Sequence, residues 1–171
     1  MSKAAGKRVQ TQFRNECIEA IVKQPDPLLC MGPGAYTLMS PRVHSVPYCK
    51  PDLLIKRVAV SGETAWAGID FLVVDNPRDD TLQRRLVALA TESTFLAAHW
   101  LCLPDNDKLV EHIRDATGQL ELANLGIATL AGDALVAMHM PSGPPGHDRR
   151  GIWQPPRLCR DIMEIRADDE I

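Results

Sequence analysis

Two aspartates in this chain are spaced so that their carboxylates could share one divalent cation. Asp52 opens an apolar run, and Asp70 lies within a second such run, "GIDFLVVD". If the two runs are the strands of one hairpin with its turn at 61–63, Asp52 faces Phe71 or Leu72 and Asp70 is its near neighbour. Diagonal neighbours of this kind lie about 7–8 Å apart at the backbone. A cation held between them would polarise a phosphodiester and lower the pKa of its bound water.

Hydrolysis of that kind also needs a basic side chain beside the metal, to orient the nucleophile and offset the charge on the phosphate. The position two residues after Asp70 is occupied by Leu72. Lys56 shares the strand parity of Asp52 but lies roughly 13 Å along the strand. Lys56, or Lys50 before the pair, is the best available basic candidate. Further polar or cationic side chains lie on the next predicted helix, namely Gln83, Arg84 and Arg85.

The surrounding sequence predicts the elements that must hold these residues. Apolar runs bounded by turn residues predict strands, and a 3.6-residue periodicity predicts helices. The predicted elements are a helix at 8–23, strands at 52–60 and 64–74, a helix at 79–93, a strand at 95–103, a helix at 107–117, and strands at 125–130 and 134–140. This αββαβαββ order predicts an α/β (α+β) fold with helices flanking a small mixed sheet. His99 falls in a buried strand and is expected to be a hydrogen-bonded core residue.

Two segments lie outside this regular pattern. Residues 25–51 hold a series of prolines and are expected to have little regular structure, yet they are too apolar for plain disorder. We interpret them as an arm that covers a surface, such as a subunit interface. Residues 146–171 are expected to be an irregular tail, in which 157–165 has the mixed periodicity of a short helix. The chain is therefore expected to be one domain over 1–145, followed by that tail.

Composition narrows the class of protein. The chain has 171 residues, a formal net charge of −3 and 45% hydrophobic residues, which is ordinary for a globular protein. A negative charge gives no overall electrostatic footprint for nucleic acid. Five cysteines without a CxxC motif make a disulfide framework unexpected, and a reducing cytoplasm fits better. The N-terminus lacks the apolar core of a signal peptide, and the longest apolar run is too short to cross a bilayer. We expect a cytoplasmic protein that does not enter membranes.

In these features the chain resembles the PD-(D/E)xK nuclease-like superfamily. Pro51-Asp52 matches the "PD", Asp70 matches the second acid, and Glu16 stands on the first helix where many members carry an extra acid. The likeness in layout covers roughly residues 8–140. It implies a restriction-endonuclease-like mixed sheet, Mg²⁺ bound by Asp52 and Asp70 with help from Glu16, and DNA as a partner. Leu72 departs from the motif, which has lysine at that position.

Several hypotheses about function follow. The first is a divergent PD-(D/E)xK-like protein, either hydrolysing phosphodiesters with a metal or catalytically degenerate in a DNA-related or mobile-element context. The alternative is a non-catalytic interaction protein that forms a homo-oligomer such as a dimer, favoured by the acidic pI, the missing lysine and the arm. Asp70 has a purely structural interpretation too. An unpaired buried carboxylate is costly, so Asp70 would then either pair with Arg57 or Lys56 or lie at a sheet edge.

Overall fold

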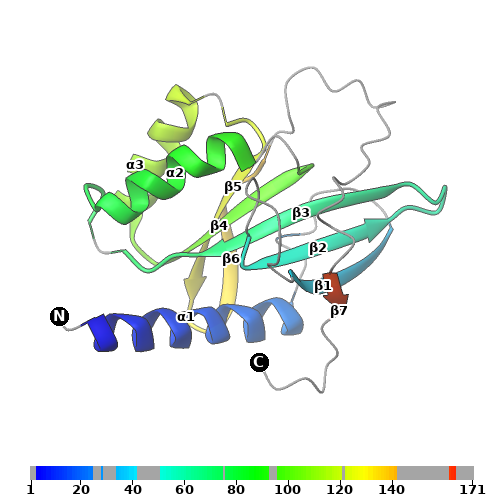
Figure 1. The fold of residues 1–171 in the computed structure, drawn as a ribbon, viewed down its shortest axis with the longest axis horizontal. Coiled ribbons are helices and arrows are strands. Elements are labelled where there is room, and N and C mark those ends of the chain that lie inside the picture. Colours follow the sequence, from blue (N-terminus) through cyan, green and yellow to red (C-terminus); the bar gives the residue numbers. More distant parts are fainter. Residues whose placement is uncertain are drawn as a thin grey trace.

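The computed structural model describes residues 3–24, 28, 34–41, 51–74, 76–92, 96–120, 122–141 and 162–164. Its elements are α1 (Lys3–Lys23), β1 (Ala35–Pro41), β2 (Leu53–Val58), β3 (Thr64–Phe71), α2 (Asp80–Glu92), β4 (Ala98–Pro104), α3 (Asp107–Gln119), β5 (Leu125–Ala131), β6 (Ala134–His139) and β7 (Ile162–Glu164). The strands form one mixed seven-stranded sheet in the order β6-β5-β4-β3-β2-β1-β7 (Figure 1). The α+β class predicted from the sequence is confirmed.

The connections between strands determine where the helices lie. β1, β2 and β3 are antiparallel neighbours in chain order, and a tight turn joins β2 to β3. β3, β4 and β5 are parallel, so each of the two steps between them needs a crossover, and α2 and α3 supply these. β6 returns antiparallel to β5 through a tight turn. α1 lies on the opposite side of the sheet from α2 and α3 (Figure 1).

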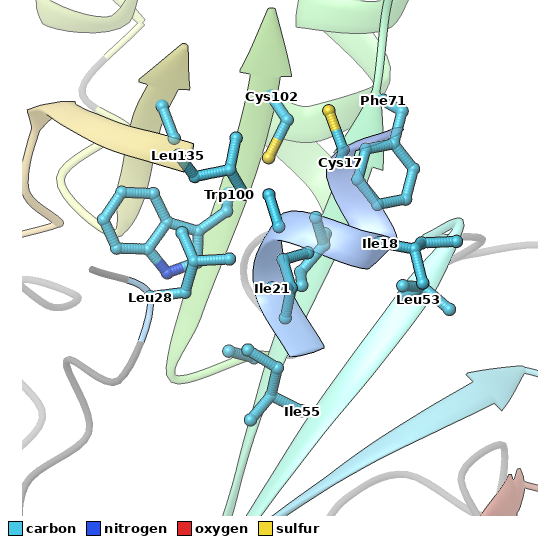
Figure 2. Packing of buried hydrophobic residues seen from close by; sticks show 14 of the residues in the cluster. Cys17, Ile18, Ile21, Leu28, Leu53, Ile55, Phe71, Trp100, Cys102 and Leu135 are labelled. Carbon is cyan, nitrogen blue, oxygen red and sulfur yellow. The ribbon is translucent and has the colours of Figure 1, made fainter. Parts of the chain in front are cut away.

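Each face of the sheet has its own hydrophobic core. On one face α1 inserts Cys17, Ile18 and Ile21 against side chains of the strands, among them Leu53 and Trp100 (Figure 2). On the other face, apolar residues of α2 and α3 pack on β4 and β5. The second cluster includes Leu82, Leu86, Leu89, Leu109 and Ile113 from the helices and Leu101, Leu103, Leu125 and Ile127 from the strands. Because β3 and β4 are covered on both faces, any charged group on them has to find a partner within the protein.

Two predictions about irregular segments need correction. Within 25–51, residues Ala35–Pro41 are not part of an unstructured arm but form β1, which pairs along β2. Tyr36 and Leu38 of this strand pack on the α1-side core, and that burial outweighs the proline signals. The expected short helix at 157–165 is wrong as well, because Ile162–Glu164 is a strand paired with the end of β1.

The remainder of both segments, including 42–50 and 142–161, lies outside the described residues, so the function of the arm stays a prediction. The division into a domain over 1–145 and a tail also stays a prediction. In the part of the chain that the structure describes, no helix combines the length and apolarity needed to cross a membrane.

Candidate functional site

The β2–β3 hairpin brings the two predicted acids together. Leu53, the first residue of β2, pairs with Ile69 of β3. Extending this register by one residue brings Asp52 opposite Asp70. Asp70 points to the sheet face that α2 covers, where it contacts Arg85. The negative charge of Asp70 is felt at the Asp52 carboxyl, which is consistent with this short separation.

The turn explains why the register differs from the predicted one. The N–H of Ala59 donates to the carbonyl of Glu63 at 2.8 Å, which leaves a three-residue loop ending at Gly62. Gly62 has a φ of +86°, the left-handed conformation that ends this type of hairpin loop and favours glycine. The turn predicted from the sequence, at 61–63, is centred one residue later than the observed loop. That prediction therefore placed the partner of Asp52 one or two residues beyond Asp70.

Asp70 is the buried centre of the site, with only 5% of its surface exposed. Its Oδ2 lies 2.5 Å from Nη2 of Arg85 on α2 and 2.5 Å from Nε2 of His99 on β4. Burial by itself would raise the pKa of Asp70, but the hydrogen bond and charge of His99, together with Arg85, hold that pKa below its ordinary value. Asp70 is therefore an ionised carboxylate whose counter-charge the protein itself provides.

His99 contacts Asp70 from a fully buried position. Its Nε2 faces the carboxylate, whereas Nδ1 is buried and finds no hydrogen-bond partner among the described residues. Solvent does not reach this ring, so His99 holds Asp70 in place and is not positioned to exchange protons with a substrate. The sequence-based interpretation of His99 as a hydrogen-bonded core residue is confirmed.

Asp52 is partly exposed and has a different partner. Its Oδ2 accepts a hydrogen bond from the backbone N–H of Phe71 at 2.9 Å. Burial raises the pKa of Asp52, and the charge of Asp70 raises it further. The Phe71 N–H and the guanidinium groups of Arg14 and Arg85 lower this pKa in part. Asp52 thus serves as a hydrogen-bond acceptor for the end of β3, where β2 no longer provides a partner.

Gln10 of α1 completes the same end of β3. Its Nε2 donates to the carbonyl of Phe71 at 2.6 Å, and its Oε1 accepts from the N–H of Val73 at 3.0 Å. On the other side of the strand, the N–H of Leu72 donates to the carbonyl of Cys102. The backbone groups at this end of β3, including the Phe71 carbonyl, are therefore bonded within the protein.

Two residues predicted for the site lie apart from the acid pair. Glu16 is exposed on α1, where its carboxylate accepts a hydrogen bond from Gln12 at 2.9 Å. The ammonium group of Lys56 lies 5.8 Å from the centre of the Trp66 ring, four strand positions from Asp52. The charges that act on the two carboxylates come instead from Arg14, Arg85 and His99.

Leu72 also has a defined environment. It is partly buried against the core formed with α2 and α3, so an apolar side chain at this position contributes to packing. Sequence reasoning had noted Arg85 on the following helix but could not choose it over Arg84. It did not identify Gln10 or Arg14, because only the position of α1 on the sheet brings them to the strand end.

The sequence matches no protein-family model and no curated protein. The kind of ligand that this site could bind is therefore inferred from its side chains. Mg²⁺ requires a set of oxygen ligands in octahedral geometry. Here Oδ2 of Asp70 is engaged by two nitrogen groups and faces a guanidinium, and the Phe71 carbonyl is engaged by Gln10. Among the described residues, no three His, Cys, Asp or Glu side chains gather as metal ligands. These oxygen atoms are therefore already engaged by side chains of the protein itself.

Proposed function

We propose that this chain is a PD-(D/E)xK-like protein in which the acid pair has become a structural ion-pair centre. It would be a catalytically degenerate relative that acts in a DNA-related or mobile-element context without hydrolysing phosphodiesters. The observation that supports this most directly is the contact between Arg85 and Asp70, with Nη2 and Oδ2 2.5 Å apart. The protein's own guanidinium stands beside the carboxylate that would otherwise bind a metal.

The chemistry of arginine supports the loss of hydrolysis. A guanidinium stays protonated in proteins, so Arg85 cannot take a proton from a water nucleophile, as a lysine of lowered pKa can. Arg85 could only offset negative charge, and its guanidinium is already paired with the Asp70 carboxylate. The alternative is an active enzyme in which an incoming metal displaces Arg85, whose side chain is 20% exposed. The two hypotheses differ in whether the wild-type protein binds metal.

The layout supports the relationship to the superfamily without depending on activity. α1 precedes a meander that carries the two acids, and α2 leads from the second acid strand to a parallel neighbour. The two acids lie at neighbouring ends of adjacent strands. A restriction-endonuclease-like sheet and DNA as a partner are what this layout leads us to propose.

Calorimetric titration with Mg²⁺ and with Mn²⁺ tests the proposal. We expect no binding to the wild-type protein, and no cleavage of plasmid DNA or single-stranded RNA in the presence of either ion. Arg85→Met, which removes the guanidinium, should bind the ions weakly. Arg85→Met combined with Asp52→Asn should lose that binding and serves as the matched control. Metal binding by the wild type that disappears in Asp70→Asn, together with cleavage that needs Asp52, would establish an active nuclease instead.

A further inference from the structure

β6 is the outer strand at one edge of the sheet. Among the described residues it has a strand neighbour only on its β5 side. The sheet ends differently at its other edge, where β7 covers the outer side of β1. α1 contacts β6 through the face that carries Leu135 and Ala137, not by adding a strand. The outer side of β6 therefore has hydrogen-bonding groups with no strand partner in the described part of the chain.

The β5–β6 turn determines which residues of β6 direct their backbone outward. Ala131 and Ala134 form the last pair before a two-residue turn, in which Gly132 has a φ of +68°. The pair that closes such a turn is hydrogen-bonded, and bonded and non-bonded positions then alternate as far as Ala137, after which the pairing with β5 shifts register. Leu135 and Ala137 consequently direct their N–H and C=O groups away from β5.

The side chains of β6 lack the features that normally protect an edge strand. Natural edge strands carry charged residues or proline, which discourage pairing with another chain. The segment Ala134–His139 has no Asp, Glu, Lys, Arg or Pro. Val136 is 44% exposed, and Met140 just after the strand is 51% exposed. An uncharged edge with exposed apolar side chains is suited to pairing with another uncharged strand.

We propose that β6 pairs with β6 of a second copy of this chain, antiparallel and about a two-fold axis at Val136. In a continuous sheet, two residues that pair across adjacent strands direct their side chains to the same face of the sheet. A two-fold axis through Val136 satisfies this requirement for both copies of β6. Leu135 of each copy then faces Ala137 of the other, and these are the two residues whose backbone groups point outward. The exposed Val136 side chains meet at the axis as a β-branched pair.

Self-pairing is favoured over a different partner because the strand complements itself. In each copy, the outward backbone groups of Leu135 and Ala137 both find hydrogen-bond partners, and no like charges face each other across the axis. One short strand pair buries little surface, so the dimer should be weak. This interface is independent of the acid pair and of any activity there.

Sedimentation equilibrium over a wide range of protein concentration tests this interface. We expect a monomer–dimer equilibrium for the wild type. Val136→Lys should raise the dissociation constant at least about tenfold, because two ammonium groups would meet at the axis. Ala137→Pro should have a similar effect, since it removes an outward N–H and no bond to β5. Val60→Lys, at a fully exposed turn position, is the matched control and should leave the dimer unchanged.

Circular dichroism confirms that each variant is folded, and Val136→Lys alone decides the outcome if Ala137→Pro does not fold. A wild type that stays monomeric at the highest concentration would overturn the proposal. A dimer that survives Val136→Lys unchanged would also overturn it and would assign the contact to another surface. If this edge bound a different protein and the chain did not self-associate, the proposal of β6 self-pairing would also be wrong.

Discussion

Replacing Arg85 by methionine should destabilise the fold, because it leaves the Asp70 carboxylate buried with only His99 as a partner. Asp70 is 5% exposed and Arg85 is 20% exposed in its side chain, so the pair is mostly shielded from water. Removing one partner of a buried ion pair costs about 3–5 kcal/mol. His99 remains and water can enter from the open side, so we expect a loss of about 2–3 kcal/mol in the free energy of unfolding.

A double-mutant cycle separates the pair from other effects of the substitution. Asp70→Asn keeps a side chain that can bond to His99 and leaves Arg85 with access to solvent, so it should cost about 1–2 kcal/mol. The double variant should lose less than the sum of the two single losses, with a coupling of about 2 kcal/mol. Methionine preserves the apolar stem of the arginine, so lost packing contributes little.

The measurement is urea unfolding at a series of pH values, with an unchanged dependence on denaturant as the check for two-state behaviour. The folded protein holds the pKa of Asp70 below its ordinary value of 3.8. The stabilisation is therefore complete above that value and is lost as the pH falls through the lower pKa of the folded state. The deficit of Arg85→Met should accordingly be largest near neutral pH and shrink in acid. The assignment of Arg85 as the counter-charge would be refuted if the stability loss of Arg85→Met did not change with pH. It would also be refuted if the losses of Arg85→Met and Asp70→Asn simply added in the double variant.

Two further predictions concern the strands around the pair. Asp52→Ala should cost about 1–3 kcal/mol, since the N–H of Phe71 loses its acceptor, whereas Asp52→Asn keeps an acceptor and removes the repulsion with Asp70. Because the folded state raises the pKa of Asp52, ionisation of this group opposes folding as the pH rises through its raised pKa, and urea unfolding of Asp52→Asn should lack that loss. Gly126→Ala would place Cβ 2.5 Å from the Trp100 ring, so thermal unfolding should show a loss of about 1–3 kcal/mol; an unchanged midpoint would contradict that contact.

The neighbouring acids could be predicted because a hairpin needs only local information. Alternation along each strand places Asp52 and Asp70 on one face, and a short turn limits the register to a few choices. The error in register came from Gly62, whose positive φ allows the loop to close one residue earlier. β1 was missed for a different reason. Its strand character depends on burial of Tyr36 and Leu38 against a core formed by distant segments.

The partners of the acids were beyond sequence reasoning because they depend on parallel pairing and helix placement. His99 shares a face with Asp70 only through the β3–β4 register, and no tight turn fixes the register of parallel strands. The choice of Arg85 over Arg84 depends on how α2 is rotated on the sheet. Its buried residues Leu82, Leu86 and Leu89 set that rotation, and Arg85 lies on the edge of the same stripe.

Leu72 and Arg85 have complementary roles around Asp70, one in packing and the other as counter-charge. Position 72 has the same strand parity as Asp70, so a lysine there would supply a cation to the carboxylate from within the strand. With leucine at that position the side chain packs into the core of α2 and α3, and the counter-charge has to come from the helix. A lysine introduced at position 72 would meet the Arg85 guanidinium beside the same carboxylate and would lose the apolar contacts of Leu72.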